Sequence, residues 1–457
     1  MTGLVCDVVI IGSGPAGMFA ADQLLRCGRR VVMVERGRPM ARRACPPGPG
    51  CDCRLCDVLE GDGGAGSFSD GKITLSGTRG THGRPLFTTA QEAMLSQVDA
   101  TIRRLVPDHR DYPPVDRLPA LDGHAATGLR FEAYPLLHVG SDGIRAFGER
   151  FCAELVSRGL TLLSGHEATH IVADDRRVTG TVVGDRCGRY RHVDAEAVIV
   201  ATGMAGTVWL ENELDRLGII PASGPADIGI RVETTAAALH PFIGDFYDFK
   251  IAHTSPAGIT ARSFCVNGHG FIVNEFHRPL GIRGVNGHSF LDRQSDQSNL
   301  AVMATIDTTN TPDPKAYVRT LARDINAATD GYPVQQRLAE FLGDRHTGPA
   351  QGVTPSNPKT RPGRLDLLLP LDLYEVFAGY LTALGAVLPP VLGADTVLYA
   401  PEIKYYNYRV PVDPATWEST DVAGLFVVGN AAGYTASLSA AALSGIIAGQ
   451  ALTTPAR

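Results

Sequence analysis

The chain has 457 residues, 44% of them hydrophobic, which predicts a large buried core and two or three structural units. The formal net charge of -6 and the lack of a dense Lys/Arg block argue against nucleic acid or an anionic membrane surface as partner. No apolar run approaches the roughly 20 residues of a membrane span, so we expect a cytoplasmic protein. Its 9 cysteines indicate reduced thiols rather than a disulfide framework.

The N-terminal segment LVCDVVIIGSGPAGMFAADQLLRCGRRVVMVER (4–36) predicts a strand, a glycine turn, a helix and a second strand. The apolar run 8–11 is typical of a buried parallel strand, and 15–26 has helical periodicity. A second strand over 31–34 then ends at Glu35. This context makes the G-x-G-x-x-G pattern a dinucleotide-binding fingerprint rather than a chance match.

Each glycine of the fingerprint has its own physical task. Gly12 permits the tight turn, Gly14 lets backbone N–H groups approach a pyrophosphate, and Gly17 lets the helix pack on the strand. The positive end of the helix dipole then faces the phosphates. Glu35 is placed to accept hydrogen bonds from both ribose hydroxyls and would repel a 2′-phosphate, which favours FAD or NAD over NADP. The contacts predicted in this segment are Gly12, Ser13, Gly14, Pro15, Ala16, Gly17, Glu35 and Arg36.

Two later segments resemble parts of flavoproteins of the glutathione-reductase type. A short apolar strand over 425–428 is followed by a Gly-Asn turn and a helix of small residues, where such proteins hold the ribitol chain. The strand AEAVIVATG (195–203) follows a three-stranded excursion, an order that belongs to the FAD fold and favours FAD over NAD. The predicted contacts are Ala168, Thr202, Gly203, Gly429, Asn430, Ser437 and Leu438.

Seven motifs spread along the chain extend this likeness: GGAGSFSDGK, LLHVGSDGIRAF, PADIGIRVE, RSFCVNGHGFIVNE, GVNGHSF, LYAPEIK and GNAAGY. With them the sequence resembles a mostly uncharacterised family of FAD-dependent dehydrogenases related to fumarate-reductase and geranylgeranyl-reductase flavoproteins. The resemblance implies an α/β fold with FAD as cofactor. A glutathione-reductase-type Rossmann domain would comprise 1–210 and 395–457, and an inserted α+β substrate or cap domain would comprise 211–394.

The loop GSFSDGKI (66–73) has the glycine and lysine spacing of a phosphate-binding loop but places Ile73 where a nucleotide hydrolase needs Ser or Thr for Mg²⁺. By resemblance, this loop lies against FAD instead. Gly63 and Gly64 would let backbone approach the cofactor, and Lys72 would sit near the isoalloxazine, where a cation favours the anionic reduced flavin. The alternative is a surface lysine after a flexible turn.

Candidate acid–base groups are few. Oxidation of a C–H bond beside an alcohol or amine needs a base for the heteroatom proton, and His or a desolvated carboxylate suits that task. We predict Lys72, His138, His288, Glu402 and Tyr406 as catalytic candidates. A histidine in a turn such as NGHS is also a common structural hydrogen-bonding residue, and Tyr405 or Tyr406 could simply pack in the core.

The sequence departs from the family pattern where flavin and substrate should meet. Asn430 stands in place of an acid, Ala436 and Ser437 in place of paired glycines, and Lys404 in place of an arginine. Asn430 can still hydrogen-bond a ribitol hydroxyl, because an amide both donates and accepts. These differences indicate a specialised substrate.

The cysteine loop 45–56 leaves three interpretations open. Cys53 and Cys56 form a C-x-x-C pair that could pass electrons to flavin, and together with Cys45 and Cys51 they could bind zinc. The spacing is irregular for zinc, so we predict no metal and a structural or redox-sensitive loop.

No second nucleotide fingerprint occurs in 211–394, so a nicotinamide would have to enter the substrate cleft itself. The sequence therefore favours oxidation of a small organic substrate by FAD over NAD(P)H-driven reduction of a C=C or C=N bond. A third alternative is a non-catalytic FAD-binding interaction protein. The sequence names neither the substrate, the electron acceptor nor the oligomeric state.

Overall fold

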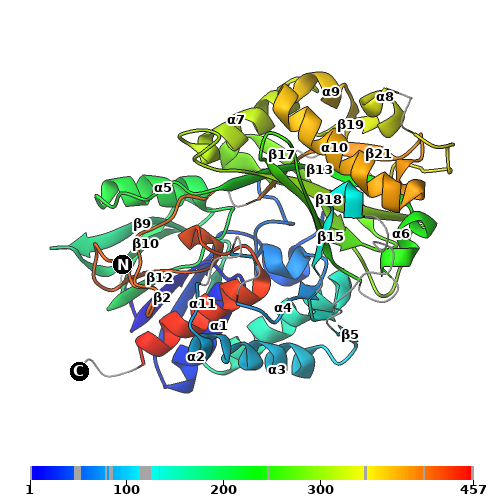
Figure 1. The fold of residues 1–457 in the computed structure, drawn as a ribbon. Coiled ribbons are helices and arrows are strands. Elements are labelled where there is room, and N and C mark those ends of the chain that lie inside the picture. Colours follow the sequence, from blue (N-terminus) through cyan, green and yellow to red (C-terminus); the bar gives the residue numbers. More distant parts are fainter. Residues whose placement is uncertain are drawn as a thin grey trace.

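The protein is described as a computed structural model over residues 3–45, 53–77, 80–81, 86–113, 125–132, 134–243, 247–343, 347–404 and 407–453. Its lower part in Figure 1 contains a parallel sheet with helices, and its upper part contains a larger, mainly antiparallel sheet. Each part has its own hydrophobic core. No helix among these residues is long and apolar enough to cross a membrane.

The parallel sheet has five strands, and every neighbouring pair in it is parallel. The predicted strand 8–11 and helix 15–26 are confirmed, and the next strand extends to Glu35. The sheet order is β22 (Leu425–Val427), β12 (Ala197–Val200), β2 (Val8–Ile11), β3 (Val31–Glu35) and β8 (Thr161–Ser164).

Two helices from opposite ends of the chain pack side by side below this sheet (Figure 1). They are α1 (Pro15–Arg26) and α11 (Leu438–Ala451). Glycines in α11 allow the contact, because a Cβ at Gly445 would lie 2.0 Å from the Ala16 carbonyl oxygen. This packing brings the starts of both helices to the same side of the sheet. Further helices in this part are α2 (Thr89–Glu92), α3 (Leu95–Leu105), α4 (Gly140–Ser157) and α5 (Thr207–Arg216).

A four-stranded sheet extends beside the parallel sheet. It contains the three-stranded excursion that the sequence predicts ahead of β12, joined by the N-terminal strand. Its order is β1 (Leu4–Val5), β11 (Tyr190–Asp194), β10 (Arg177–Gly184) and β9 (Glu167–Asp174).

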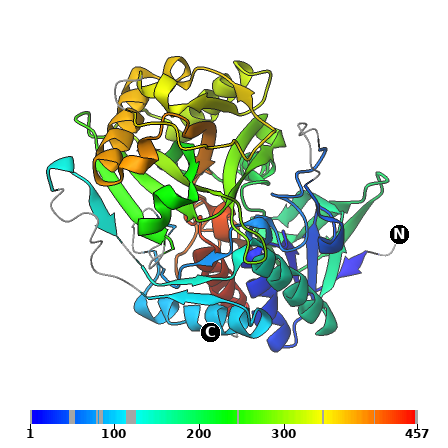
Figure 2. The same cartoon turned by 90° about the vertical axis from the view of Figure 1, so that its right-hand side faces the viewer.

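The upper part is built on an eight-stranded sheet, seen from a second side in Figure 2. Its order is β20 (Arg361–Pro362), β19 (Val334–Arg337), β21 (Val397–Lys404), β13 (Ala226–Thr235), β18 (Gln297–Ile306), β15 (Thr260–Asn267), β14 (Lys250–Thr254) and β6 (Arg130–Glu132). Its helices are α6 (Ala236–Ile243), α7 (Pro314–Ala327), α8 (Leu338–Leu342), α9 (Leu365–Leu368) and α10 (Leu371–Val387).

Two small sheets complete the structure: the hairpin of β16 (Phe271–His277) with β17 (Ile282–His288), and the order β4 (Lys72–Ile73), β7 (Leu136–His138), β5 (Arg110–Tyr112).

The predicted α/β class, with a parallel sheet and an additional unit, is confirmed. The eight-stranded sheet also includes β6 and β21, which lie outside 211–394. The division of the chain into 1–210 with 395–457 and 211–394 stays a prediction.

Candidate functional site

A single cavity of about 330 Å³ collects the segments that the sequence assigns to a cofactor. Gly12 and Gly429, from opposite ends of the chain, both line it. The predicted residues on its wall are Gly12, Ser13, Gly14, Pro15, Ala16, Glu35, Arg36, Gly64, Lys72, Ala168, Thr202, Gly203, Gly429, Asn430, Ser437 and Leu438. Convergence of separate glycine turns on one cavity is the arrangement that a long dinucleotide requires.

The turn between β2 and α1 has the backbone geometry that its glycines predict. Gly12 has φ +104°, and a Cβ there would lie 2.4 Å from the Ala201 carbonyl oxygen. At Gly14 a Cβ would meet only the Gly64 Cα, at 3.8 Å, so the space above this residue is open. Gly14 is also the N-cap of α1, which places the positive end of that helix dipole at the cavity.

Gly17 and Gly63 do not line the cavity. A Cβ at Gly17 would lie 2.2 Å from the Gly12 carbonyl oxygen, so Gly17 serves the predicted close packing of helix on strand. Gly63 has φ +83°, and a Cβ there would lie 2.3 Å from the Ser67 hydroxyl oxygen. Its direct approach to a cofactor is not supported, because Gly63 shapes the turn behind the cavity wall and Gly64 alone of the pair reaches it.

The Glu35 carboxylate lies at the cavity wall and accepts four hydrogen bonds from the protein. The Ser13 N–H and hydroxyl donate to Oε2 at 3.1 and 2.9 Å. The Gly37 and Gly61 N–H groups donate to Oε1 at 2.8 and 3.0 Å. These bonds fix the orientation of the carboxylate, so any ribose hydroxyls would share oxygens that already have protein donors. The ribose contact stays a prediction.

Arg36 is held rigidly at the same end of the cavity. Its Nε donates to Glu60 Oε2 at 2.8 Å, and its Nη2 donates to the Ala205 carbonyl oxygen at 2.8 Å. Although burial opposes the charge, Glu60 holds the pKa of the Arg36 guanidinium above its ordinary value. A fixed planar cation beside Ala168 and Trp209 on the cavity wall suits stacking on a base.

The start of α11 forms a further part of the cavity wall, next to the start of α1. Ser437 is its N-cap, and its side chain accepts a hydrogen bond from the Ala440 N–H at 3.1 Å. Asn430 donates from Nδ2 to the Thr435 carbonyl oxygen at 2.9 Å. Asn407 donates from Nδ2 to the Asn430 carbonyl oxygen at 2.9 Å and accepts from the Thr207 hydroxyl. The N-termini of two neighbouring helices, α1 and α11, therefore open onto the cavity.

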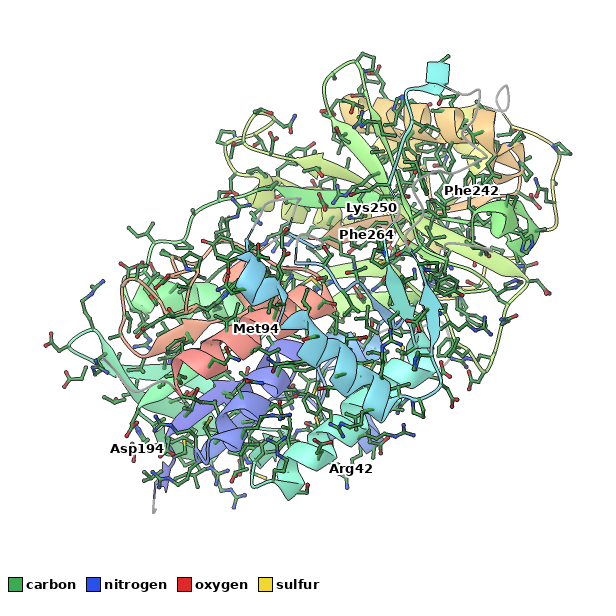
Figure 3. All side chains as sticks on the ribbon, turned by 60° about the horizontal axis from the view of Figure 1, so that its bottom comes forward. Arg42, Met94, Asp194, Phe242, Lys250 and Phe264 are labelled. Carbon is green, nitrogen blue, oxygen red and sulfur yellow. The ribbon has the colours of Figure 1, made fainter. Side chains whose placement is uncertain are left out.

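The far end of the cavity carries charged side chains of both signs, and we call it the charged end: Asp70, Lys72, Asp248, Lys250, Glu275 and Lys404. Lys250, Glu275 and Lys404 belong to strands β14, β16 and β21, and Asp248 lies just before β14. Phe264 and Cys265 of β15 line the cavity with them. Figure 3 shows Lys250 and Phe264 together where the two parts of the molecule meet.

Lys72 is the centre of one ionic cluster at the charged end. Its Nζ lies 3.0 Å from Asp70 Oδ2 and 3.6 Å from Asp248 Oδ2, and it also donates to the Val266 carbonyl oxygen. Burial opposes the charge, but Asp248 and Asp70 together raise the pKa of Lys72 above its ordinary value. Since its side chain is only 5% exposed, the alternative of a surface lysine is wrong.

Glu275 and Lys404 form a second ionic cluster. Glu275 Oε2 lies 3.8 Å from Lys404 Nζ and 3.6 Å from His277 Nε2, and the Asn286 amide donates to Oε1. Burial works to raise the pKa of Glu275, but Lys404 and His277 outweigh it and hold the pKa far below its ordinary value.

The two predicted histidines are buried and do not line the cavity. His138 Nε2 lies 3.1 Å from the Asp70 carbonyl oxygen and 3.2 Å from the Ser289 hydroxyl, and its ring stacks on Tyr247. Burial, assisted by the Lys72 charge, lowers the pKa of His138 to about 4. Burial also lowers the pKa of His288. This geometry does not support either histidine as a base for a substrate in the cavity.

Glu402 is fully buried and likewise absent from the cavity wall. Both of its oxygens accept from Arg231, at 2.8 Å each, in a bidentate pair. Its geometry fits a structural ion pair and not the predicted base. Tyr405 and Tyr406 lie outside the described residues, so the role of Tyr406 stays a prediction.

The described cysteines of the loop, Cys45, Cys53 and Cys56, form no disulfide bond with one another. Cys45 Sγ lies 3.4 Å from Lys359 Nζ, while buried Cys56 accepts from the Phe276 N–H at 3.5 Å. Cys51 lies outside the described residues. Among the residues that are described, no three His, Cys, Asp or Glu side chains gather as a metal site.

Comparison with known proteins agrees with this geometry. Residues 6–213, which include the glycine turn, Glu35, Ala168 and β12, match the family described as pyridine nucleotide-disulphide oxidoreductase. The protein is an FAD-dependent oxidoreductase. The resemblance to FAD-dependent flavoproteins is thereby confirmed, and FAD is the cofactor.

The flavoprotein also has distant full-length relatives. An uncharacterised protein of Clostridium beijerinckii is 24% identical over 96% of this chain and 79% of its own. Among solved structures, a flavoprotein/dehydrogenase from Cytophaga hutchinsonii has a TM-score of 0.45 at 12% identity, covering 98% of this chain and 78% of that one. A geranylgeranyl bacteriochlorophyll reductase-like protein from Thermoplasma acidophilum has a TM-score of 0.40 at 11% identity, with the same coverage. Likenesses this distant do not identify a reaction.

The residues of the cavity fit FAD on structural grounds. The space above Gly14 is open, Arg36 is fixed for a base, and the starts of α1 and α11 supply N–H groups. When bound, FAD supplies two-electron hydride chemistry at its N5.

Sequence reasoning missed several residues of the charged end, above all Asp248, Glu275 and Cys265. Cys265 and Glu275 lie in the motif RSFCVNGHGFIVNE, which carries the family resemblance but does not reveal which of its side chains face the cavity. One usable signal existed for the lysines. The chain has lysine only at 72, 250, 315, 359 and 404, and three of these, Lys72, Lys250 and Lys404, line the cavity.

Proposed function

We propose that the protein oxidises a small organic substrate by hydride transfer to FAD. The observation that carries the proposal is that one cavity is lined both by the dinucleotide turn and by the charged end. The cofactor segments come mainly from the parallel-sheet part, while two lysines of the charged end, Lys250 and Lys404, come from strands of the eight-stranded sheet. A substrate site at the join of two structural units is a common arrangement.

The oxidative direction is supported by the sheet topology. In the described residues, one five-stranded parallel sheet carries the dinucleotide turn, and the strands of the upper part are mainly antiparallel. A nicotinamide would therefore have to enter the charged end itself. NAD(P)H-driven reduction of a C=C or C=N bond is the second candidate.

The cavity also supports a role for Lys72. A buried ammonium near the isoalloxazine would favour the anionic reduced flavin, and the Asp70 and Asp248 contacts fix its position. The proposal includes a cytoplasmic location and a small molecule, not nucleic acid, as the substrate, in keeping with the net charge of -6.

The test is anaerobic mixing of the yellow holoprotein with separate pools of alcohols, amines and organic acids, and with NADH and NADPH. We expect bleaching of the flavin absorbance by at least one organic pool and slow or no bleaching by either nicotinamide. Rapid bleaching by NADH or NADPH alone would establish the reductive alternative instead.

A further inference from the structure

Lys404 is a buried cation at the charged end, which the sequence places where flavin and substrate should meet without giving it a role. It ends β21, its side chain is 9% exposed, and it lines the cavity. Burial opposes its charge, but Glu275 and Glu402 outweigh burial and raise the pKa of Lys404. The side chain is therefore an ammonium at neutral pH.

The contacts of Lys404 differ from those of Lys72. The Lys404 Nζ lies 3.8 Å from Glu275 Oε2 and 3.8 Å from Glu402 Oε1. Both distances exceed the roughly 3.2 Å limit of an N–H···O hydrogen bond. Lys72, by contrast, has Asp70 and the Val266 carbonyl oxygen within bonding distance. An ammonium has three N–H donors, and those of Lys404 form no hydrogen bond with any described residue.

The two carboxylates beside Lys404 are already engaged elsewhere. Glu402 is held by Arg231 in a bidentate pair, and Glu275 accepts from the Asn286 amide. They compensate the charge of Lys404 at a distance without satisfying its donors. Lys404 lines the cavity, so its N–H donors reach that space, where a charged ligand acceptor can bond them in place of water. The cavity is the space where such an acceptor can lie.

The charge balance limits what this acceptor is. The acceptor would lie on the cavity side of the Lys404 ammonium, and the Glu275 and Glu402 carboxylates lie 3.8 Å from the same ammonium. These two carboxylates favour an acceptor with a single negative charge. A dianion such as a phosphate monoester would meet stronger repulsion from the same carboxylates. The cavity wall also carries the rings of Phe264 and Tyr134, which suit an apolar body.

We propose that Lys404 binds a carboxylate group of the substrate, so that the substrate is a small organic monoacid with an apolar body. This inference rests on the proposed function, whose site it specifies further. Lys404 is a binding residue, while Glu275 and the Arg231–Glu402 pair position it. A carbon of the bound acid would then pass a hydride to FAD while the neighbouring atom releases a proton to water, so that a double bond forms between them and the carboxylate remains unchanged.

The test is ligand binding to the FAD-loaded protein, followed by the difference spectrum of the oxidised flavin. Acetate, benzoate, phenylacetate and 3-phenylpropionate are titrated beside their neutral amides. We expect the aromatic acids to bind more tightly than their amides. Lys404→Met should weaken acid binding about 10- to 100-fold, the range of a charge-assisted bond, and leave amide binding nearly unchanged.

Two further variants separate charge from general damage. Lys404→Arg keeps the cation and should retain acid binding to within about tenfold. Glu275→Gln keeps an acceptor for Asn286 but removes a negative charge near the ligand, so it should tighten acid binding several-fold. If Lys404→Met does not fold, the other two variants still test the role of Lys404, because Lys404→Arg should retain acid binding and Glu275→Gln should tighten it. FAD content and thermal unfolding are measured for every variant.

The inference is overturned if none of the four acids binds, if acids and amides bind alike, or if Lys404→Met binds acids as tightly as the original protein. Because binding needs no turnover, its failure is distinct from failure of the proposed function. Flavin bleached by a neutral alcohol with no acid binding would keep the function and remove the role of Lys404. Acid binding at Lys404 without flavin reduction by any substrate would keep the role of Lys404 and remove the proposed function.

Discussion

Gly64 lies against Gly14 at backbone contact distance: a Cβ at Gly64 would stand 2.6 Å from the Gly14 Cα. The two residues belong to the loop that follows the cysteine segment and to the dinucleotide turn, and both line the cavity. Gly64 also has φ +63°, where glycine is favoured. Because neither glycine has a side chain, the two backbone segments can lie in contact, and their backbone groups remain accessible from the cavity.

Replacing Gly14 with valine should abolish FAD binding without unfolding the protein. The new side chain would point into open cavity space, since a Cβ at Gly14 meets only one atom, at 3.8 Å. The measurement is the ratio of flavin to protein after purification, together with far-UV circular dichroism. Gly348→Val is the matched control, because a Cβ at Gly348 would meet only the Leu392 carbonyl oxygen, at 3.9 Å, and the residue lies away from the cavity. A yellow Gly14→Val protein would contradict this account of the site.

Replacing Lys72 with methionine should lower the reduction potential of the bound FAD by tens of millivolts, since 30 mV corresponds to about 1.4 kcal/mol for two electrons. The physical reason is loss of a buried cation while Asp70 and Asp248 remain. Spectroelectrochemical titration measures the shift. Lys72→Arg keeps the charge and should stay near the original potential. An unchanged potential in Lys72→Met would show that Lys72 does not act on the flavin.

Replacing Glu402 with alanine should reduce the free energy of unfolding by about 3–5 kcal/mol, because Arg231 would keep a buried charge without its partner. Both side chains are fully buried. Urea denaturation checks the value. Glu402→Gln keeps the shape and should be destabilised as well, to a smaller extent. If Glu402→Gln instead retained full stability and lost turnover, the originally predicted role as a base would return.

Acidification should destabilise the protein through His138. Its pKa is about 4 in the folded protein, below the ordinary value of 6.5, because of burial. Between pH 6.5 and 4 the unfolded chain therefore takes up a proton that the folded protein does not. The free energy of unfolding should fall over that window by an amount on the order of 2–3 kcal/mol. Comparison with His138→Gln by urea denaturation at several pH values isolates this contribution, and identical pH profiles would disprove it.

The cofactor side of the site could be predicted from sequence because its signals are local. Gly12, Gly14 and Gly17 lie within one turn and helix, and their spacing fixes the backbone that approaches a phosphate. The short buried strands on either side are equally recognisable. Gly63 was predicted as a cofactor contact but does not line the cavity, since the pattern GG does not reveal which of two neighbouring glycines faces it.

The substrate side could not be predicted in the same way because its contacts are long-range. Lys72 bonds to Val266 across 194 residues and lies 3.6 Å from Asp248, and Glu275 and Lys404 line the same cavity from two other strands. The histidines illustrate the opposite error. His138 is chemically suitable as a base, but burial behind Asp70 removes it from the cavity.

Asn407 has a consequence for how the site opens. This single buried amide is bonded to Thr207 at the start of α5 and to Asn430, and it lies three residues beyond the end of β21. Swinging the eight-stranded sheet away from the parallel sheet would break these solvent-shielded bonds at once. We therefore expect ligands to enter the cavity without a hinged separation of the two halves.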